Sequence, residues 1–289
     1  MRESLPFCLD LPGGRTLNGT VDRSNLPEPC PTVVICHGFK GFMEWGFFPH
    51  LASLLTDRGL TAVRFTFSGA GMMPGDELVT DIAAFRTATF SRDLEDLLAL
   101  LEAVGRRIAP ESIDPDRLGL LGHSRGGGTA ILATAREAWR DRLRALVTWS
   151  AVSSFDRLSS EEKEAWRRQG AITVVNARTG QELPLDVVVL EDLETNRLRL
   201  DPLAAAGRRT APWLIVHGEE DESVPAEEGR RLATAAGEPS ELFMVAGGSH
   251  TFGAEHPFKG PTPQLIQVLN ATQRWFRQHL AQRHRGERN

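Results

Sequence analysis

Short apolar runs rich in β-branched residues alternate along the chain with stretches whose apolar residues recur at helical spacing. We interpret the runs as strands and the stretches as helices. Strands are expected at 7–11, 16–21, 32–36, 61–67, 118–121, 145–149, 213–217 and 241–245, and helices at 48–57, 91–104, 225–236 and 263–280. This alternation predicts an α/β protein, with a mostly parallel central sheet and helices on both of its faces.

The first strands and the second helix show how these elements should pack. Pro12-Gly13-Gly14 joins the first two strands, which predicts an opening hairpin. In the helix at 91–104, leucines recur at helical spacing at positions 94, 97, 98 and 101. This helix is therefore expected to lie with one apolar face on the sheet.

Residues 153–209 depart from the alternation. They begin with a charged run and continue with two apolar runs, 172–176 and 186–189, which we interpret as a pair of strands. The segment is too long for a strand–helix–strand connection. We predict a small inserted cap over the carboxyl edge of the sheet, where open α/β folds bind ligands. The alternative is a solvent-facing excursion that plays no part in substrate choice.

The composition is that of an ordinary globular protein. The chain has 289 residues, 41% hydrophobic and 25% charged, and we expect a single domain over 1–289 with 153–209 as its cap. A net charge of −5 gives no general attraction to nucleic acid or anionic membranes, so neither is expected as a partner. The Arg-rich end, 274–288, is interpreted as the exposed face and tail of the last helix.

The cysteines and the first residues bear on the compartment. Cys8, Cys30 and Cys36 are odd in number and lack metal-binding spacing, which argues against a disulfide framework. Residues 1–7 lack the continuous apolar core of a signal peptide, and no later stretch is long enough to span a bilayer. We expect a cytoplasmic protein, and the sequence leaves a homodimer open.

The sequence Gly122-His123-Ser124-Arg125-Gly126 stands between an apolar run and a stretch of small residues. The Gly-x-Ser-x-Gly pattern turns a strand sharply into a helix and exposes the serine beside backbone N–H groups. Glycine is needed on both sides because the tight turn leaves no room for a Cβ atom. Ser124 is therefore the predicted nucleophile.

A serine nucleophile needs a base, and the base needs an acid that orients it. His250 follows the last strand and is the predicted base, with His256 as an alternative that we interpret as a surface residue. Asp221 follows the preceding strand and is the predicted acid. Its acidic neighbours are interpreted as solvated loop charges: Glu219, Glu220 and Glu222. The order serine, aspartate, histidine is that of an α/β hydrolase.

A buried strand that ends in His-Gly supplies the loop expected to complete the site. The backbone N–H groups of Phe39 and Arg125 are predicted to hold the oxyanion. The side chains of Lys40 and Arg125 are interpreted as solvated charges. Phe39 and Phe42 are expected to face the site, and Phe42 and Trp149 are the candidate residues of a substrate pocket.

Two other patterns are set aside. The run 69–75 imitates a dinucleotide-binding loop, but Pro74-Gly75 interrupts the helix start that such a loop requires. We interpret it as a rim of the active site. Cys36-His37, and His250 with Glu255-His256, supply no spaced set of three or four metal ligands. Neither a cofactor nor a metal is expected.

The His-Gly-Phe loop, Gly-His-Ser-Arg-Gly-Gly, His-Gly-Glu-Glu-Asp-Glu-Ser-Val-Pro and Gly-Gly-Ser-His, in this order, resemble the α/β-hydrolase superfamily. Within it, the chain is similar to dienelactone-hydrolase-like and prolyl-oligopeptidase-like esterases, including the feruloyl esterase type with a small cap. The resemblance implies a triad of Ser124, His250 and Asp221 and an oxyanion hole at Phe39 and Arg125. Dienelactone hydrolases carry a cysteine nucleophile, so the serine favours simple esters over lactones.

The expected function is that of a serine hydrolase that cleaves small-molecule carboxylic esters through an acyl-enzyme. An oligopeptidase, aminopeptidase or amidase would use the same groups. An aminopeptidase would also need acidic cap residues to bind the substrate amine, and the candidates are Asp186, Glu191, Asp192 and Glu194. A non-catalytic ligand-binding protein is the alternative from another class, although binding alone has no need of a complete triad.

Overall fold

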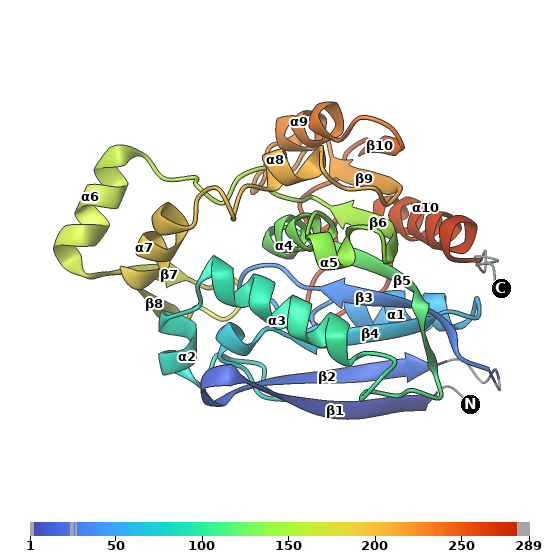
Figure 1. Cartoon of the computed structure of the whole chain (residues 1–289). Coiled ribbons are helices and arrows are strands. Elements are labelled where there is room, and N and C mark those ends of the chain that lie inside the picture. The colour runs from blue at the N-terminus through green and yellow to red at the C-terminus, as the bar shows by residue number, and fades with distance from the viewer. Residues whose placement is uncertain (1–2, 24–25, 27, 282–289) are drawn as a thin grey trace.

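A computed structural model describes residues 3–23, 26 and 28–281, so residues 282–289 of the expected basic tail lie outside the described part. An eight-stranded sheet runs through the molecule in the order β1-β2-β4-β3-β5-β6-β9-β10 (Figure 1). The pairs β1–β2 and β2–β4 are antiparallel, and the other neighbours are parallel. The strands are β1 (Glu3–Leu11), β2 (Arg15–Arg23), β3 (Cys30–Cys36), β4 (Thr61–Thr66), β5 (Ile113–His123), β6 (Leu143–Trp149), β9 (Trp213–Gly218) and β10 (Ser240–Val245).

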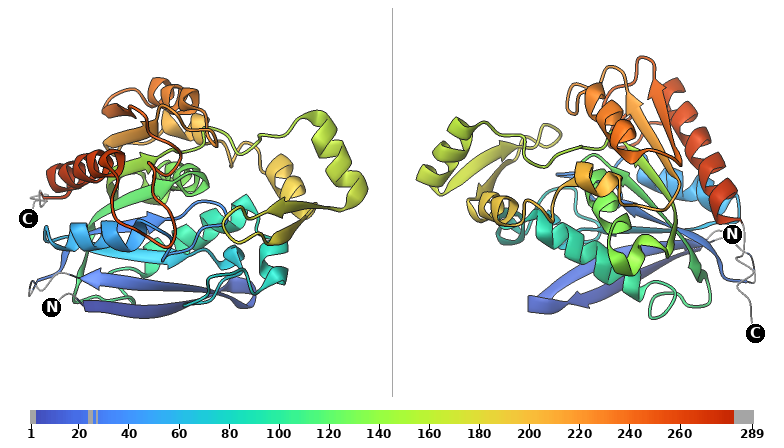
Figure 2. Two further views of the ribbon diagram at one scale, coloured as in Figure 1. Left: turned by 180° about the vertical axis from the view of Figure 1, so that it is seen from behind. Right: turned by 45° about the horizontal axis from the view of Figure 1, so that its top comes forward.

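Helices cover both faces of this sheet (Figures 1 and 2). One face packs against α1 (Phe48–Thr56) and α10 (Pro263–Leu280). The other packs against α3 (Phe90–Ala103), α4 (Arg125–Thr134), the short α5 (Glu137–Arg140) and α9 (Ala226–Ala236). The predicted α/β fold, with a mostly parallel sheet between two layers of helices, is confirmed.

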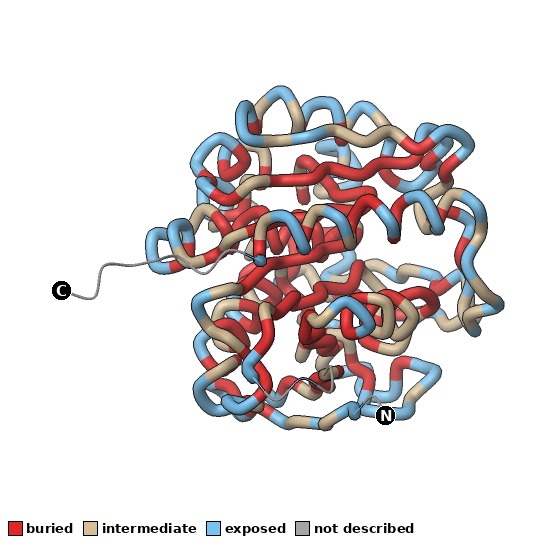
Figure 3. Tube along the Cα trace, turned by 90° about the vertical axis from the view of Figure 1, so that its right-hand side faces the viewer, coloured by how far each residue is buried: buried red, intermediate tan, exposed pale blue. Residues whose placement is uncertain are grey.

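The two layers follow from the two-residue period of a strand. In β3, Val34 belongs to the core beneath α3 and α4, whereas Val33 and Ile35 belong to the core beneath α1 and α10. All three are almost completely buried, because a parallel sheet is covered on both faces. Figure 3 shows the buried residues concentrated along the central strands.

The opening hairpin is also confirmed, since β1 and β2 pair from Glu3↔Arg23 to Leu11↔Arg15. The turn η1 (Pro12–Gly14) joins them, and Gly13 and Gly14 adopt φ values of 77° and 73°. These left-handed conformations favour glycine. A second short helix, η2 (Ser68–Ala70), and then α2 (Ile82–Arg86) follow β4.

The chain between β6 and β9 forms a cap that stands beyond the carboxyl edge of the sheet (Figures 1 and 2). The cap consists of α6 (Ser160–Gln169), the antiparallel pair β7 (Ala171–Val175) and β8 (Glu182–Asp186), and α7 (Val188–Thr195). The short α8 (Pro202–Ala206) packs instead on α4 and α9 of the body. The cap therefore ends before α8, short of the predicted boundary at residue 209.

The predicted second cap strand at 186–189 is wrong. The strand lies earlier, at Glu182–Asp186, where Leu183 and Leu185 alternate with more exposed residues. Val188 begins α7, and Val189, Leu190 and Leu193 bury one face of that helix. The apolar run belongs to a helix because its buried positions continue at helical rather than alternating spacing.

Candidate active site

Ser124 occupies the turn between β5 and α4. Its backbone has φ 56° and ψ −124°, and its N–H donates to the carbonyl of Trp149 at 2.9 Å. A Cβ atom on Gly122 would lie 2.4 Å from the carbonyl oxygen of Gly126, and one on Gly126 would lie 2.2 Å from that of His37. Both positions therefore require glycine, and the strained backbone turns the serine out of the sheet.

The structure brings Asp221 and His250 together from the loops after β9 and β10. His250 Nδ1 lies 2.8 Å and 3.1 Å from the two Asp221 carboxylate oxygens. Asp221 Oδ1 also accepts hydrogen bonds from the amides of Ser223, at 2.9 Å, and Val224, at 2.8 Å. Burial by itself raises the pKa of Asp221, but the hydrogen bonds from His250 and Val224 outweigh it, and the pKa lies below its ordinary value.

The alternatives to these residues lie in other settings. Glu219, Glu220 and Glu222 are exposed, whereas Asp221 is buried. His256 accepts a hydrogen bond from the Gly46 amide at 2.9 Å, and its Nε2 lies 2.8 Å from Glu77. His256 is thus held on the rim of the body rather than beside Asp221.

Ser124 and His250 lie at the same edge of the sheet, but no hydrogen bond joins the Ser124 hydroxyl to the His250 ring within the described residues. His123, which precedes Ser124 in the chain, contacts His250. The His123 ring lies 4.7 Å from the His250 ring between centroids, and its Nε2 lies 3.0 Å from the His250 carbonyl oxygen. In unliganded sites, catalytic hydrogen bonds are often long and tighten when substrate binds.

Three buried histidines for which the sequence predicted no role hold the loops of the site. Nε2 of His123 donates to the carbonyl of His250, and that of His217 donates to the carbonyl of Val224 at 2.9 Å. His37 accepts from the amide of Phe67 at 3.0 Å and contacts the Gly38 carbonyl at 2.8 Å. Their only signal in the sequence is position, since each lies at or just beyond the carboxyl end of a strand.

Burial disfavours the charged form of these three rings. It lowers the pKa of His123 to about 3 and that of His37 to about 4, and it also lowers the pKa of His217. A neutral imidazole has one N–H donor and one acceptor nitrogen. The observed bonds, to a carbonyl on one side and from an amide on the other in His37, match that form.

The loop after β3 passes close to the elbow. A Cβ atom on Gly38 would lie 3.0 Å from Cβ of Ser124, so the backbone preceding Phe39 lies against the serine. Arg125 is the first residue of α4, where a backbone N–H has no partner within the helix. The amides proposed from the sequence thus belong to two segments that flank Ser124.

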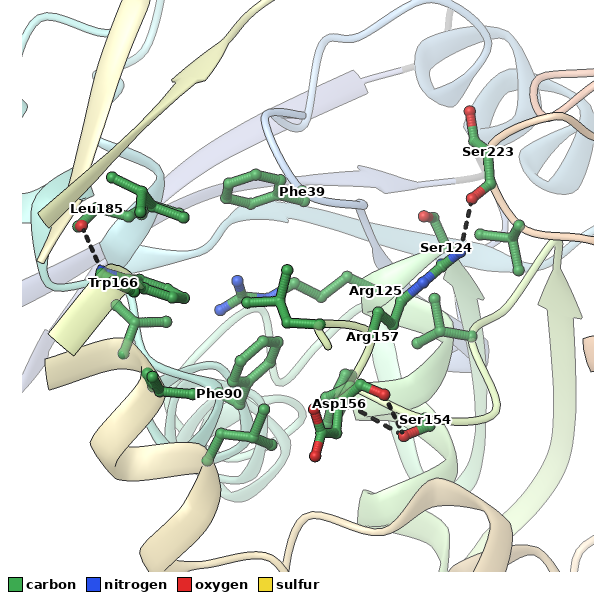
Figure 4. Close-up of a pocket in the computed structure, with 18 residues that line it drawn as sticks. Phe39, Phe90, Ser124, Arg125, Ser154, Asp156, Arg157, Trp166, Leu185 and Ser223 are labelled. Carbon is green, nitrogen blue, oxygen red and sulfur yellow. Dashed lines mark hydrogen bonds between the residues drawn. The ribbon is translucent and has the colours of Figure 1, made fainter. Parts of the chain in front are cut away.

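An apolar cavity of about 310 Å³ lies between the body and the cap, with Ser124 in its wall (Figure 4). The body contributes Phe39, Phe90, Arg125, Val152, Phe155, Ser223 and Val224, and the cap and its entry segment contribute Ser154, Asp156, Arg157, Leu158, Trp166, Ile172, Leu185, Val189, Leu190 and Leu193. The cavity thus lies beneath the cap, at the edge of the sheet where open α/β folds bind ligands.

The two candidate pocket residues do not line this cavity. Trp149 is fully buried below the elbow, where its Nε1 donates to Thr272 at 2.9 Å and its ring packs on Phe47. Phe42 packs against the ring of His256, in an apolar cluster that also contains Trp166 and Leu185 of the cavity wall, but Phe42 itself does not reach the cavity. Trp149 fails as a pocket residue because β6 points its side chain into the sheet's α1–α10 face.

The interpretation of Lys40 and Arg125 as solvated charges is also corrected. Lys40 Nζ donates to the carbonyl of Val175, at the end of β7, at 2.9 Å. Arg125 is buried, and its Nε pairs with Asp93 Oδ2 at 2.7 Å. Both charged groups are therefore engaged by the protein.

The remaining patterns have structural accounts. Residues 68–70 form η2, and Val79, further along that loop, exchanges two hydrogen bonds with the Gln181 side chain of the cap.

Among the described residues, no three His, Cys, Asp or Glu side chains are grouped in a way that would hold a metal ion. No described helix combines the length and apolar character needed to cross a membrane.

The fold and the placement of these residues define the class: the protein is a serine hydrolase of the α/β-hydrolase fold. The sequence model of the prolyl oligopeptidase family matches residues 45–283, and the chain belongs to this family.

Relatives extend along most of the chain. An uncharacterized 31.7 kDa protein from the traX-finO intergenic region of Escherichia coli is 26% identical over 300 residues, covering 92% of this chain and 96% of that protein. The 2,6-dihydropseudooxynicotine hydrolase of Paenarthrobacter nicotinovorans is 30% identical over 228 residues, covering 78% of this chain and 53% of that protein. The structure of Est1E from Butyrivibrio proteoclasticus with bound ferulic acid matches with a TM-score of 0.70 and 23% identity, covering 96% of this chain and 100% of that one.

Proposed function

We propose that the protein hydrolyses carboxylic esters through an acyl-enzyme formed on Ser124. The observation that carries the proposal is the contact of 2.8 Å between Asp221 and His250, beside a serine in an elbow conformation at the wall of the cavity. A base oriented by an ionised acid is what a serine hydroxyl needs to become a nucleophile.

In the proposed mechanism, His250 Nε2 takes the proton of Ser124 while the hydroxyl oxygen attacks the ester carbonyl. The amides of Phe39 and Arg125 donate to the oxyanion, and His250 then gives its proton to the leaving alcohol. Water, activated by the same imidazole, attacks the acyl-enzyme and releases the acid. Asp221 keeps His250 in the required tautomer and stabilises its charged form.

An ester is favoured over a peptide with a free amino end by the lining of the cavity. None of the four acidic cap residues considered for amine binding lines it, and Asp156, which does line it, pairs with Lys163. Asp186 pairs with Arg86 at 2.7 Å, Glu194 pairs with Arg167, and Asp192 accepts from the Ser91 amide. A cavity with mostly apolar walls supports an apolar acyl group in place of an ammonium group.

The test is the dependence of turnover on Ser124. Ser124→Ala is expected to lower kcat for a short p-nitrophenyl ester by roughly four decades or more, as removal of a triad nucleophile does in serine hydrolases. Ser240→Ala, at the start of β10, is the matched control and should retain normal turnover. A fluorophosphonate probe should label the wild type and the control but not Ser124→Ala.

Paired substrates decide between the candidate activities. An acyl ester and an aminoacyl anilide of similar size are compared under the same conditions, and the ester should be the better substrate. Because Est1E binds ferulic acid, hydroxycinnamoyl esters belong in the panel beside acetyl to octanoyl esters. Faster cleavage of the anilide would reject the esterase assignment, and near-normal turnover by Ser124→Ala would reject the mechanism.

A further inference from the structure

The Arg125 side chain is an unusual component of an apolar cavity. Its Nε donates to Asp93 Oδ2 at 2.7 Å, and its Nη2 donates to the Ala88 carbonyl at 2.9 Å. The guanidinium carbon lies 4.1 Å from the ring centre of Phe90 and 5.4 Å from that of Phe39. Figure 4 shows the group between these two rings, directed toward Trp166 of the cap.

Part of this guanidinium is left without a protein partner. The group carries five N–H donors, and its two hydrogen bonds use Nε and Nη2. Nη1 donates to no residue in the described part of the chain, although Arg125 as a whole is only 9% exposed and lines the cavity. Since this part of the guanidinium is accessible from the cavity, a substrate oxygen that accepts from Nη1 gains a charge-assisted hydrogen bond, which an oxygen placed against the apolar walls does not.

The charges around Arg125 limit which kind of substrate oxygen can bind to Nη1. The Asp93 carboxylate already pairs with the guanidinium, and the Asp192 carboxylate lies close enough to raise the pKa of Asp93 further, after burial, which is the main cause. A substrate carboxylate at Nη1 would bring a further negative charge to a guanidinium that already pairs with Asp93, whereas a ketone, hydroxyl or ether oxygen would not add charge. The setting therefore favours a neutral acceptor.

We propose that Arg125 Nη1 forms a polar subsite in the cavity and selects esters whose acyl chain carries a neutral oxygen acceptor some distance from the ester carbonyl. The inference rests on the proposed esterase function. Since the Arg125 amide holds the ester carbonyl in that mechanism, the attached acyl chain begins beside the Arg125 side chain. Arg125 is then both an oxyanion donor, through its backbone, and a specificity determinant, through its side chain.

The experiment compares p-nitrophenyl esters of equal acyl length. One series has a plain alkanoyl chain, a second carries a single ketone at successive positions, and a third ends in a carboxylate. For the wild type, one ketone position should give a kcat/KM about tenfold above the plain chain, in line with a hydrogen bond to a charged donor. The other ketone positions should fall at or below the plain chain, because an unpaired ketone is costly to desolvate.

The variants separate the subsite from general damage. In Arg125→Met, the ratio of ketone to plain ester should fall to about one or lower, since the variant keeps an apolar side chain but no donor. Arg64→Met is the matched control. Arg64, on β4, is also a buried arginine and pairs with Asp22 at 2.7 Å, but it does not line the cavity. This control should keep the wild-type ratio whatever its stability.

Three results would overturn the subsite: equal turnover of all ketone positions by the wild type, an unchanged ratio in Arg125→Met, or a preference for the carboxylate series that requires Arg125. If Arg125→Met does not fold, Arg125→Lys replaces it: the single ammonium can pair with Asp93 but has no second arm at the position of Nη1, so the ratio should again fall to about one. Loss of Ser124-dependent turnover of the plain esters would instead reject the esterase function. A flat ketone panel with normal plain-ester turnover rejects the subsite alone.

Discussion

Asp221 differs from its three acidic neighbours in burial and in the bonds it accepts. The amides of Ser223 and Val224 fix Oδ1, and the carboxylate faces Nδ1 of His250. The lowered pKa keeps the carboxylate ionised throughout the neutral range. An ionised acceptor at Nδ1 places the ring proton there and leaves Nε2 free to take a proton from the substrate side.

Asp221→Asn should therefore lower kcat for a good ester by roughly three to four decades, because an amide donor at Nδ1 favours the wrong tautomer of His250. Steady-state kinetics with a p-nitrophenyl ester measure the effect. Glu222→Gln, on the same loop but exposed, is the control and should change kcat little. Equal losses in the two variants would place the orienting role elsewhere.

At this scale, the sequence predicted backbone geometry better than side-chain environment. The glycine frame around Ser124 predicted the elbow because steric exclusion acts on near neighbours in the chain. Trp149 and the Arg125 side chain were misjudged because their surroundings come from distant segments. Thr272 bonds Trp149, and Asp93 and Phe90 hold Arg125.

At the scale of the elements, three histidines lie at or near the ends of strands. His37 follows β3, His123 ends β5 and His217 lies in β9, and each bonds to backbone near the site. In the unfolded chain, a histidine takes up a proton near pH 6.5. In the folded protein, burial lowers the pKa of His123 to about 3 and that of His37 to about 4. Between pH 6.5 and these lowered pKa values, the unfolded state binds more protons than the folded state. The free energy of unfolding therefore falls as the pH is lowered.

His123→Gln should remove one part of this dependence. From pH 6 to pH 4, the wild type should lose about 1.4 kcal/mol of unfolding free energy per pH unit more than the variant, which is the contribution of one proton. Glutamine keeps an N–H donor that can reach the His250 carbonyl. Urea denaturation at a series of pH values measures the difference, and parallel curves for the two proteins would contradict it.

The elements themselves were predicted where hydrophobic period and chain length agreed. The run 145–149 and the helix 263–280 were found at nearly their observed bounds. In the cap, the valines of 187–189 are compatible with either period, and packing against β8 and the body places them at the start of α7. The short helices α2, α5 and α8 were missed because four or five residues carry too little periodicity.

In the whole molecule, the cap is joined to the body by a few polar contacts besides its apolar base. Gln181 accepts from the Val79 amide and donates to the Val79 carbonyl, both at 3.0 Å. Lys40 bonds to the end of β7, and Arg178 pairs with Glu77. Arg86 of α2 likewise pairs with Asp186 of β8. Both ion pairs are partly exposed, and pairs of that kind contribute little. The Gln181 clamp is thus the contact whose loss should be felt most by β7 and β8.

Gln181→Ala should accelerate amide hydrogen exchange of β7 by about thirtyfold while leaving β5 unchanged, since it removes two hydrogen bonds that each contribute about 1 kcal/mol to local stability. Mass spectrometry of peptides that cover 171–175 and 118–123 measures the two rates. Thr173→Ala, within β7, serves as a control for substitution in the cap. Equal acceleration of both peptides would show that the clamp supports the whole fold and not the cap.

The chain leaves the sheet for the cap after β6 and returns to it at β9, and these two strands are neighbours. An excursion whose ends lie side by side can be lengthened, shortened or exchanged at little entropic cost and without shifting the register of any strand. The cap over Ser124 can therefore change during evolution while the residues of the candidate active site beneath it stay the same. Related proteins would then share one chemical step but differ in the substrates that they accept.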